Sequence, residues 1–214
     1  MNAGARRIGL LGGTLDPLHV GHLDAADAAR AALGLDEILV IPAHDPPHRR
    51  TDPHASAFHR FAMVALAIDG RAGFRASDIE LRREGPSYTS LTLRGLRSAG
   101  WQPSQLFFIL GADAFAEIST WFDYPAILDA CRFAIVARPG MTLAAALERT
   151  PALRERVGRT IHLVEAPTAD VSSTDIRKRL GANLPIDGLV PPAVARHIEV
   201  HRLYRTADDL HGQD

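Results

Sequence analysis

Short apolar runs and longer segments of helical periodicity alternate along most of the chain. Ile8–Leu11 is the first such run, and its lack of polar alternation is typical of a strand that is buried on both faces. Similar runs recur downstream, where proline, glycine or charged residues bound them. The predicted strands are 8–11, 37–41, 74–81, 106–110, 133–137 and 161–165.

The segments between these runs favour helices. In 58–68, the apolar residues Phe58, Phe61, Ala62 and Ala65 recur at intervals of three and four, which places them on one helical face. The alanine-rich segment 23–33 has high intrinsic helix propensity. The predicted helices are 23–33, 58–68, 88–99, 121–131, 142–148, 174–180 and 193–200.

Strands that alternate with helices indicate an α/β fold. Such a chain builds a mostly parallel sheet with helices on both of its faces. We find no internal repeat, low-complexity tract or linker in the sequence. We therefore expect a single domain over residues 1–206, with a C-terminal helical part from about residue 172 and a polar tail over 207–214.

Composition and charge limit the classes of partner. No apolar run approaches the roughly 20 residues that span a bilayer, and the run after Arg6 and Arg7 is too short for a signal peptide. The formal net charge is −1, so no global charge recruits nucleic acid or a membrane surface. The single cysteine, Cys131, suits a reducing compartment. We expect a cytoplasmic protein without nucleic-acid or membrane partners. The sequence does not decide whether the chain forms a homo-oligomer.

The first strand leads into the stretch GGTLDPLHVGH over residues 12–22. Gly12 and Gly13 let a ligand approach the backbone, and the helix that follows directs its amides toward the same place, which favours phosphate. His19 and His22 lie three residues apart, so they share one face in the first helical turn and can donate to that phosphate. The alternative is that both rings are helix-start side chains in water.

A second stretch, SSTDIR over residues 172–177, also opens a helix. Ser172 or Ser173 can cap this helix, and Thr174 and Arg177 add a hydroxyl and a charge at the same end. Two such helix starts suit a triphosphate held across a cleft, whereas the alternative for this one is an exposed capped helix.

Other candidates follow later strands. Gly111 and Asp113 come after the 106–110 run, where a carboxylate can accept hydrogen bonds from ribose hydroxyls. In 86–89, Ser87 is suited to cap the helix that follows, and the helix-start amides can receive a carboxylate. The histidines His44, His48, His54 and His59 match no zinc-ligand spacing, so we predict no metal site on the protein.

The stretch 12–22 resembles the ATP-binding signature of the nucleotidyltransferase superfamily, with Leu15 where phenylalanine is usual. Segments 86–89 and 172–177 resemble motifs of bacterial nicotinate-nucleotide adenylyltransferases, and 46–49 and 111–113 occur between the first and last motifs in the family's order. The resemblance extends from about Ile8 to Tyr204. It implies a Rossmann-like nucleotidyltransferase fold.

The resemblance also implies an activity in NAD biosynthesis. The adenylyl group of ATP passes to nicotinate mononucleotide, which gives nicotinate adenine dinucleotide and pyrophosphate, with Mg²⁺ carried on the ATP phosphates. His19, His22 and Arg177 are the implied catalytic residues, with help from the Thr14 backbone amide. The residues implied for ATP binding are Gly12, Gly13, Thr14, His19, His22, Gly111, Asp113, Arg138, Ser172, Ser173, Thr174 and Arg177. Those implied for the pyridine nucleotide are His48, Tyr88, Thr89 and Trp121.

Several alternatives stay open or are excluded by particular residues. Trp121 and Tyr88 also suit core packing. Lys178 is the only lysine, so neither a P-loop nor the lysine-rich loop of class I aminoacyl-tRNA synthetases fits. A phosphopantetheine adenylyltransferase shares a similar first motif, but the 86–89 segment and Trp121 disfavour it. A non-catalytic nucleotide sensor would keep both phosphate clusters.

Overall fold

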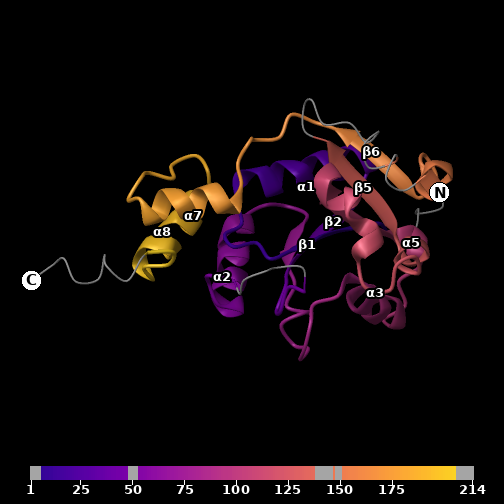
Figure 1. Cartoon of the computed structure of the whole chain (residues 1–214), viewed down its shortest axis with the longest axis horizontal. Helices are drawn as coiled ribbons and strands as arrows, with labels where there is room; N and C mark the ends of the chain where they lie inside the picture. The colour runs from indigo at the N-terminus through magenta and orange to yellow at the C-terminus, as the bar shows by residue number, and fades with distance from the viewer. Residues whose placement is uncertain (1–5, 48–52, 138–146, 148–150, 206–214) are drawn as a thin grey trace, which may run out of the picture.

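The computed structural model describes residues 6–47, 53–137, 147 and 151–205. Its centre is a six-stranded sheet in which every neighbouring pair is parallel, in the order β3-β2-β1-β4-β5-β6 (Figure 1). The strands are β1 (Ile8–Gly13), β2 (Glu37–Pro42), β3 (Phe74–Ala76), β4 (Leu106–Gly111), β5 (Arg132–Ala137) and β6 (Ile161–Glu165). The predicted α/β class with a parallel sheet is confirmed.

The strand order creates a switch point. The chain builds outward from β1 to β3 and then returns to place β4 on the other side of β1. The connections after β1 and β4 therefore diverge toward opposite faces, and a crevice opens beyond the carboxyl ends of these two strands.

Helices cover both faces of the sheet (Figure 1). The helices are α1 (Val20–Leu33), α2 (Ala57–Ile68), α3 (Thr89–Ser98), α4 (Ala112–Ala116), α5 (Ile127–Ala130), α7 (Ser173–Gly181) and α8 (Pro192–Val200). Short 3₁₀ turns occupy Pro103–Gln105, Ile118–Thr120 and Pro151–Arg156. Side chains alternate along β1, so Leu11 packs with α1, α2, α7 and α8, whereas Leu10 packs with α3, α4 and α5.

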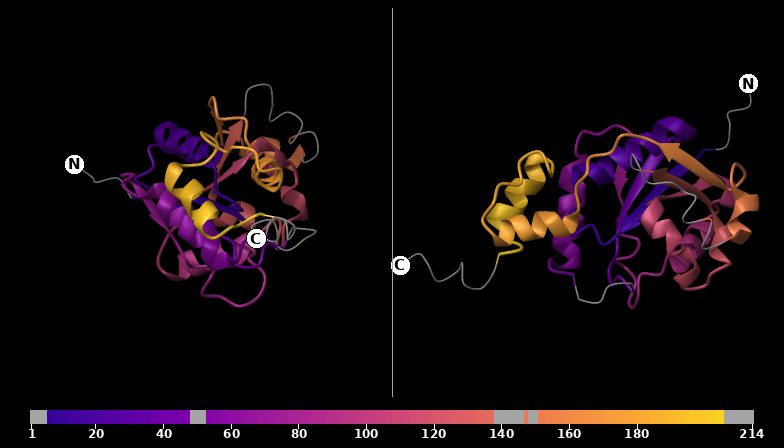
Figure 2. Two further views of the ribbon diagram at one scale, coloured as in Figure 1. Left: turned by 90° about the vertical axis from the view of Figure 1, so that its left-hand side faces the viewer. Right: turned by 45° about the horizontal axis from the view of Figure 1, so that its top comes forward.

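The C-terminal helices lie at one end of the molecule. After β6 the chain crosses the molecule to reach α7 and α8, which lie beside α2 (Figures 1 and 2). Val194 and Ile198 of α8 and Ile176 of α7 are buried in the same core as α1 and α2. Packing, rather than a linker, therefore fixes α7 next to the start of α1.

Two predicted elements are shorter than expected. The predicted strand 74–81 ends at Ala76, and the chain turns after Ser77, whose backbone N–H donates to the Val40 carbonyl. The predicted helix 121–131 is helical only over 127–130, because Asp123 adopts a positive φ of 66° and Pro125 disfavours helical geometry at the preceding residue. The predicted helix 142–148 lies outside the described residues except for Leu147.

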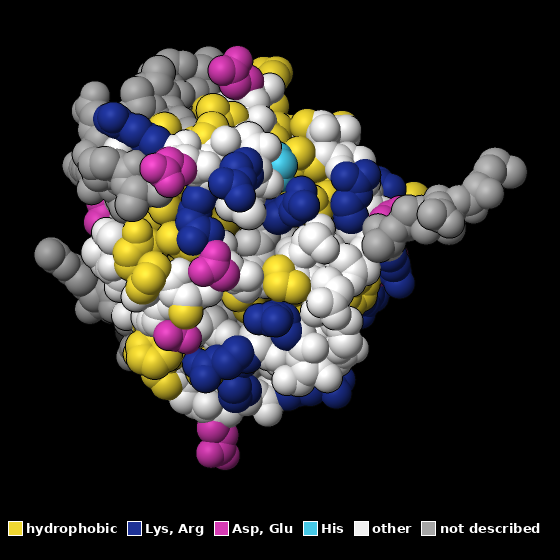
Figure 3. All heavy atoms as spheres, turned by 90° about the vertical axis from the view of Figure 1, so that its right-hand side faces the viewer, with side chains coloured by type: hydrophobic (Ala, Val, Ile, Leu, Met, Phe, Trp, Pro, Cys, Tyr) yellow, Lys and Arg dark blue, Asp and Glu magenta, His cyan; other side chains and the backbone are white. Residues whose placement is uncertain are grey.

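The described surface carries mixed charge. At the end of the molecule that holds α5, basic and acidic side chains are interspersed (Figure 3). Arg156 is paired there with Asp129 of α5 at 2.7 Å. Within the described ranges, no helix combines the length and apolar character that a bilayer span requires.

Candidate functional site

Two cavities adjoin at the switch point. One measures about 370 Å³ and has an aromatic wall, and the other, about 360 Å³, is lined by polar side chains and helix starts. Gly12, Leu110 and Ala114 line both, so the carboxyl ends of β1 and β4 divide them. A Cβ on Gly12 would lie 3.2 Å from the Phe108 ring, so the backbone at this boundary packs closely against that ring.

The polar cavity gathers residues from distant parts of the sequence. The predicted residues that line it are Gly12, His19, His22, Gly111, Asp113, Ser172, Ser173 and Thr174. Gly13 and Thr14 face the aromatic cavity together with Tyr88, Thr89 and Trp121. The predicted residues His48 and Arg138 lie outside the described residues.

His19 and His22 form one unit at the start of α1. His19 is the N-cap, with extended backbone angles, and its backbone N–H donates to His22 Nδ1 at 3.2 Å. The two rings stack with their centroids 3.7 Å apart. Because His22 Nδ1 accepts a hydrogen bond, a neutral His22 ring carries its proton on Nε2. The structure therefore defines which nitrogen of His22 is the donor.

The start of α7 is docked on the segment that leads into α1. Ser173 Oγ donates to the Pro17 carbonyl at 3.0 Å, and Arg177 Nη1 donates to the Asp16 carbonyl at 2.6 Å. Ser172 caps α7, because its Oγ accepts the Asp175 backbone N–H at 3.1 Å. The two helix N-termini thus converge on the polar cavity, each with the partial positive charge of its macrodipole.

Arg177 lies at the edge of this arrangement. It does not line the polar cavity, but its Nη2 donates to Thr174 Oγ1 at 3.2 Å, and Thr174 does line it. Its guanidinium therefore bridges the segment before α1 and the first turn of α7.

Asp113 belongs to the opposite wall of the polar cavity. It lies in the first turn of α4, directly after β4, and its side chain is exposed. A Cβ on Gly111 would lie 2.7 Å from Asp113 Oδ1, so the glycine leaves room for this carboxylate to fold back toward the strand end. The carboxylate is thus placed at the rim, within reach of a polar ligand.

Aromatic rings form the wall of the second cavity. Tyr88, the N-cap of α3, stacks on Phe122 with centroids 4.3 Å apart. Trp121 meets the Phe108 ring edge-on at 5.8 Å and is half-buried. Trp121 therefore has both of the roles considered for it, since one part packs on the core and another part lines the cavity.

The position of Ser87 in the sequence suggested that it caps α3, but the structure shows that it does not. Its Oγ accepts the backbone N–H groups of His44 at 2.9 Å and Asp45 at 3.3 Å. Its own backbone N–H donates to the Asp45 carbonyl at 2.7 Å. Ser87 instead joins the loop after β2 to the start of α3, because residue 88 is the last non-helical residue before the helix.

Comparisons with known proteins agree with this arrangement. Residues 10–179 match the cytidylyltransferase-like family. A protein of Roseiflexus sp. (strain RS-1), named as a probable nicotinate-nucleotide adenylyltransferase, is 45% identical over 200 residues, which cover 92% of this chain and 98% of that one. A protein of Symbiobacterium thermophilum with the same name is 42% identical and covers 92% of this chain and 95% of its own. This chain belongs to the nicotinate-nucleotide adenylyltransferase family.

A solved structure shows the fold of this family at greater distance. The nicotinic acid mononucleotide adenylyltransferase of Plasmodium falciparum, complexed with NaAD, superposes with a TM-score of 0.72 at 20% identity. The match covers 93% of this chain and 97% of that one. The predicted Rossmann-like nucleotidyltransferase fold is confirmed.

The family signature also contains a residue that sequence reasoning left without a role. Asp16 is fully buried, and its carboxylate accepts the backbone N–H groups of His54 at 2.9 Å and Ala55 at 3.1 Å and the Tyr204 hydroxyl at 2.8 Å. Burial raises the pKa of the Tyr204 hydroxyl, and the Asp16 charge raises it further, so Tyr204 stays a donor.

A buried arginine joins the two loops that border the aromatic cavity. Arg60 of α2 is 1% exposed and donates to four backbone carbonyls. The acceptors are Thr14 at 2.8 Å, Ala43 at 2.5 Å, His44 at 3.1 Å and Ala55 at 3.1 Å. Arg60 shares a helical face with the buried Met63, Val64 and Ala67. A charged residue on the apolar face of a predicted helix was the signal that could have pointed to it.

Glu80 is the third residue that sequence reasoning missed. It lines the aromatic cavity, is 7% exposed and accepts the Thr92 hydroxyl at 2.6 Å. Burial raises the pKa of the Glu80 carboxyl, although hydrogen bonds from Thr92 and Ser87 and the charge of Arg83 oppose the rise. A carboxyl that resists ionisation thus stands in the wall of a cavity predicted to receive an acid.

The raised pKa of Glu80 predicts a pH-dependent effect of Glu80→Gln. The folded state holds the proton more tightly than the unfolded state, so this residue's contribution to stability falls as pH rises from the unfolded pKa through the raised folded pKa. The introduced amide carbonyl can still accept the Thr92 hydroxyl. We therefore expect the free energy of unfolding of the variant to rise relative to that of the wild type as the pH increases above about 4.5.

Urea denaturation across this pH range would measure the difference. The matched control is Glu84→Gln, which replaces an exposed carboxylate in the same segment and should leave the pH profile unchanged. A constant difference between Glu80→Gln and wild type at all pH values would contradict the raised pKa.

Proposed function

We propose that this chain transfers the adenylyl group of ATP to nicotinate mononucleotide and releases pyrophosphate. The observation that carries the proposal is the pair of adjoining cavities at the switch point, one flanked by two helix starts and the other by aromatic rings. The names of the relatives from Roseiflexus and Symbiobacterium support the same reaction. The shared boundary at Gly12 is the natural place for the two phosphate groups to meet.

The polar cavity suits the triphosphate and ribose of ATP. In this proposal the helix starts of α1 and α7 receive phosphate oxygens, with donors from His19, His22, Ser172, Ser173 and Thr174. Asp113 accepts hydrogen bonds from the ribose hydroxyls. Arg177 turns from the Asp16 carbonyl toward the leaving phosphates.

The aromatic cavity suits the pyridine nucleotide. A pyridine ring can stack on Trp121, with Tyr88 and Phe122 beside it. The first-turn amides of α3, at Thr89 and Ser90, point their positive dipole end toward the cavity and suit the ring carboxylate. This pose brings the mononucleotide phosphate toward Gly12, Gly13 and Thr14.

The chemistry needs no covalent intermediate on the protein. A phosphate oxygen of nicotinate mononucleotide attacks the α-phosphorus of ATP, the bond from that phosphorus to the bridging oxygen breaks, and pyrophosphate leaves. The protein aligns the two anions and stabilises charge on the α-phosphate and the leaving group. His22 serves here through Nε2–H, and the Thr14 backbone amide assists.

We also propose that Mg²⁺ accompanies ATP and that the reaction occurs in the cytoplasm. Among the described residues that line the polar cavity, Asp113 is the one carboxylate. A cavity lining with a single carboxylate fits an ion that is carried on the phosphates better than an ion that is held by several protein ligands. The buried thiol Cys131 agrees with a reducing compartment.

A pyrophosphate-release assay with ATP and Mg²⁺ tests the proposal and its substrate. We expect turnover with nicotinate mononucleotide and a preference of at least about tenfold over nicotinamide mononucleotide in kcat/KM. The carboxylate makes charge-assisted hydrogen bonds to the α3 amides, whereas the carboxamide leaves an NH₂ group against donors, which costs about 1–3 kcal/mol.

The assay separates the alternatives. Equal efficiency with both nucleotides would contradict the position of the carboxylate at α3. Turnover of phosphopantetheine instead would identify a different adenylyltransferase. ATP binding without pyrophosphate release from any acceptor would favour a nucleotide sensor.

A further prediction concerns Trp121. Trp121→Ala should weaken the apparent affinity for nicotinate mononucleotide by about 1–3 kcal/mol, the value of one base–aromatic stack, and affect ATP far less. The KM values for both substrates measure this. Trp101→Ala is the matched control, because Trp101 packs half-buried on the same core and does not line the cavity. Equal losses for both substrates would assign Trp121 to the core alone.

Another prediction concerns His22. If Nε2–H stabilises charge in the transition state, His22→Ala should lower kcat by about a hundredfold or more. Circular dichroism and thermal unfolding establish that the variant is folded. Turnover at the wild-type rate in a folded variant would remove His22 from the mechanism.

A further inference from the structure

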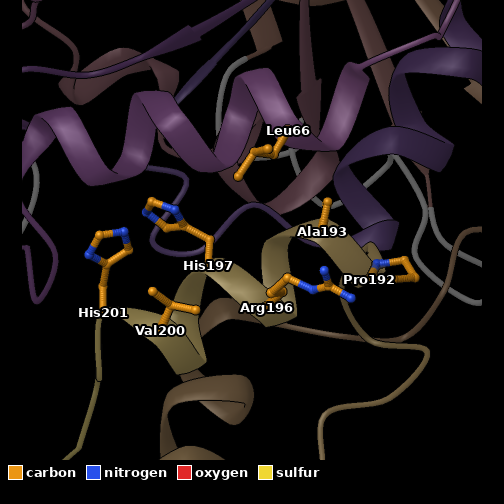
Figure 4. A pocket seen from close by; sticks show the side chains of 7 residues that line it. All are labelled: Leu66, Pro192, Ala193, Arg196, His197, Val200 and His201. Atoms are coloured by element: carbon orange, nitrogen blue, oxygen red, sulfur yellow. The ribbon is translucent and has the colours of Figure 1, made fainter.

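Three histidines from two helices meet where the C-terminal helix packs on α2. They are His59 in the first turn of α2, His197 of α8 and His201, which directly follows α8. One imidazole nitrogen from each lies within 4.8 Å of the other two. Figure 4 shows His197 and His201 projecting from the α8 side toward α2.

The packing of α8 and the cap of α2 set the positions of the three histidines. His197 and His201 are four residues apart, so they lie on one face, next to the buried Val194 and Ile198 that hold α8 on the core. Ser56 caps α2 by accepting the His59 backbone N–H at 3.3 Å, which sets His59 in the first turn. The cluster therefore depends on packing that exists without any ion.

The distances suit one shared ion. His59 Nδ1 and His197 Nε2 are 3.2 Å apart. Two nitrogens bound tetrahedrally at about 2.0–2.1 Å from a zinc ion lie about 3.4 Å apart, so this pair already has nearly the required separation. His201 is exposed, and the third nitrogen lies within 4.8 Å of the other two, so a shared ion requires the His201 side chain to move closer.

The surroundings of the cluster leave space for a further ligand. A cavity of about 430 Å³ adjoins the cluster and is lined by His197, His201, Arg196 and four apolar residues. It has room for a water molecule as a fourth ligand.

We propose that His59, His197 and His201 bind one divalent transition-metal ion of the zinc class, which links α2 to α8. Imidazole is a common ligand for zinc, nickel and copper, and three protein ligands with water complete a tetrahedral site. This replaces the prediction from sequence that the protein has no metal site, which considered His59 only with His44, His48 and His54. The site is separate from Mg²⁺ on ATP.

The link has a structural consequence. Three residues after His201, Tyr204 donates to the Asp16 carboxylate in the segment before α1. An ion between α2 and α8 holds the chain that carries Tyr204 and so supports this contact. We therefore expect the ion to stabilise the C-terminal helices rather than to take part in the reaction.

Titration of the full chain, free of any purification tag and of nucleotide, tests the proposal. Zn²⁺ is titrated against a chromogenic chelator, and Co²⁺ serves as a spectroscopic probe of tetrahedral nitrogen ligation. We expect one Zn²⁺ per chain, and a loss of affinity of at least about 10–100-fold in His197→Gln and in His201→Gln. Zn²⁺ should raise the Tm of the wild type and not that of His201→Gln, whose exposed position makes misfolding a poor explanation.

Two matched variants locate the ion. His162→Gln, in β6 and remote from the cluster, and His22→Gln, which removes the other histidine pair, should both bind Zn²⁺ as the wild type does. Absence of Zn²⁺ binding by the wild type would show that the cluster is only a hydrogen-bonded helix contact and would overturn the proposal. Zn²⁺ binding that survives in His197→Gln and His201→Gln, or that is lost in His22→Gln, would overturn it as well.

Discussion

The site depends on a buried carboxylate that holds the connection between β1 and α1. This connection must stay open to a ligand and also keep two histidines and several backbone amides in fixed positions. Burying a charge is costly unless hydrogen bonds compensate for it. Asp16 receives two backbone N–H groups and the Tyr204 hydroxyl, which come from the start of α2 and the C-terminal end of the described chain. Two distant segments are thereby tied to one side chain.

Arg60 is a second buried side chain that holds the connection between β1 and α1. Its guanidinium and the Asp16 carboxylate share Ala55, whose carbonyl accepts from Arg60 and whose N–H donates to Asp16. Arg60 also reaches the carbonyls of Thr14 and Ala43, which follow β1 and β2. The loops on both sides of the aromatic cavity are therefore held by a buried side chain, so the shape of the cavity is set before any ligand enters.

Much of the fold and of the candidate site could be predicted from the sequence, because apolar runs mark buried strands and the glycine–histidine stretch marks a helix start. The two shortened elements were missed because local pattern does not show where a chain leaves the sheet, as at Ser77, or where Asp123 takes a positive φ. Asp16, Arg60 and Glu80 were missed as positioning or cavity residues for a different reason. Their roles depend on partners that only the fold brings together, from 12 residues away for Glu80 and Thr92 to 188 residues away for Asp16 and Tyr204.

The chain binds anions, in this proposal, with a net charge of −1 and a single lysine. The geometry explains how, because the positive ends of α1 and α7 converge on one cavity and that of α3 faces the other. Backbone amides at helix starts are already oriented, so little reorganisation is needed when charge develops on a bound phosphate. Arg60 fixes the loops that present these amides, and Arg177 holds α7 on the segment before α1 until, in this proposal, it turns toward the leaving phosphates. The docking of α7 against the β1–α1 connection, through Ser173 and Arg177, is therefore what brings the two helix N-termini to one cavity.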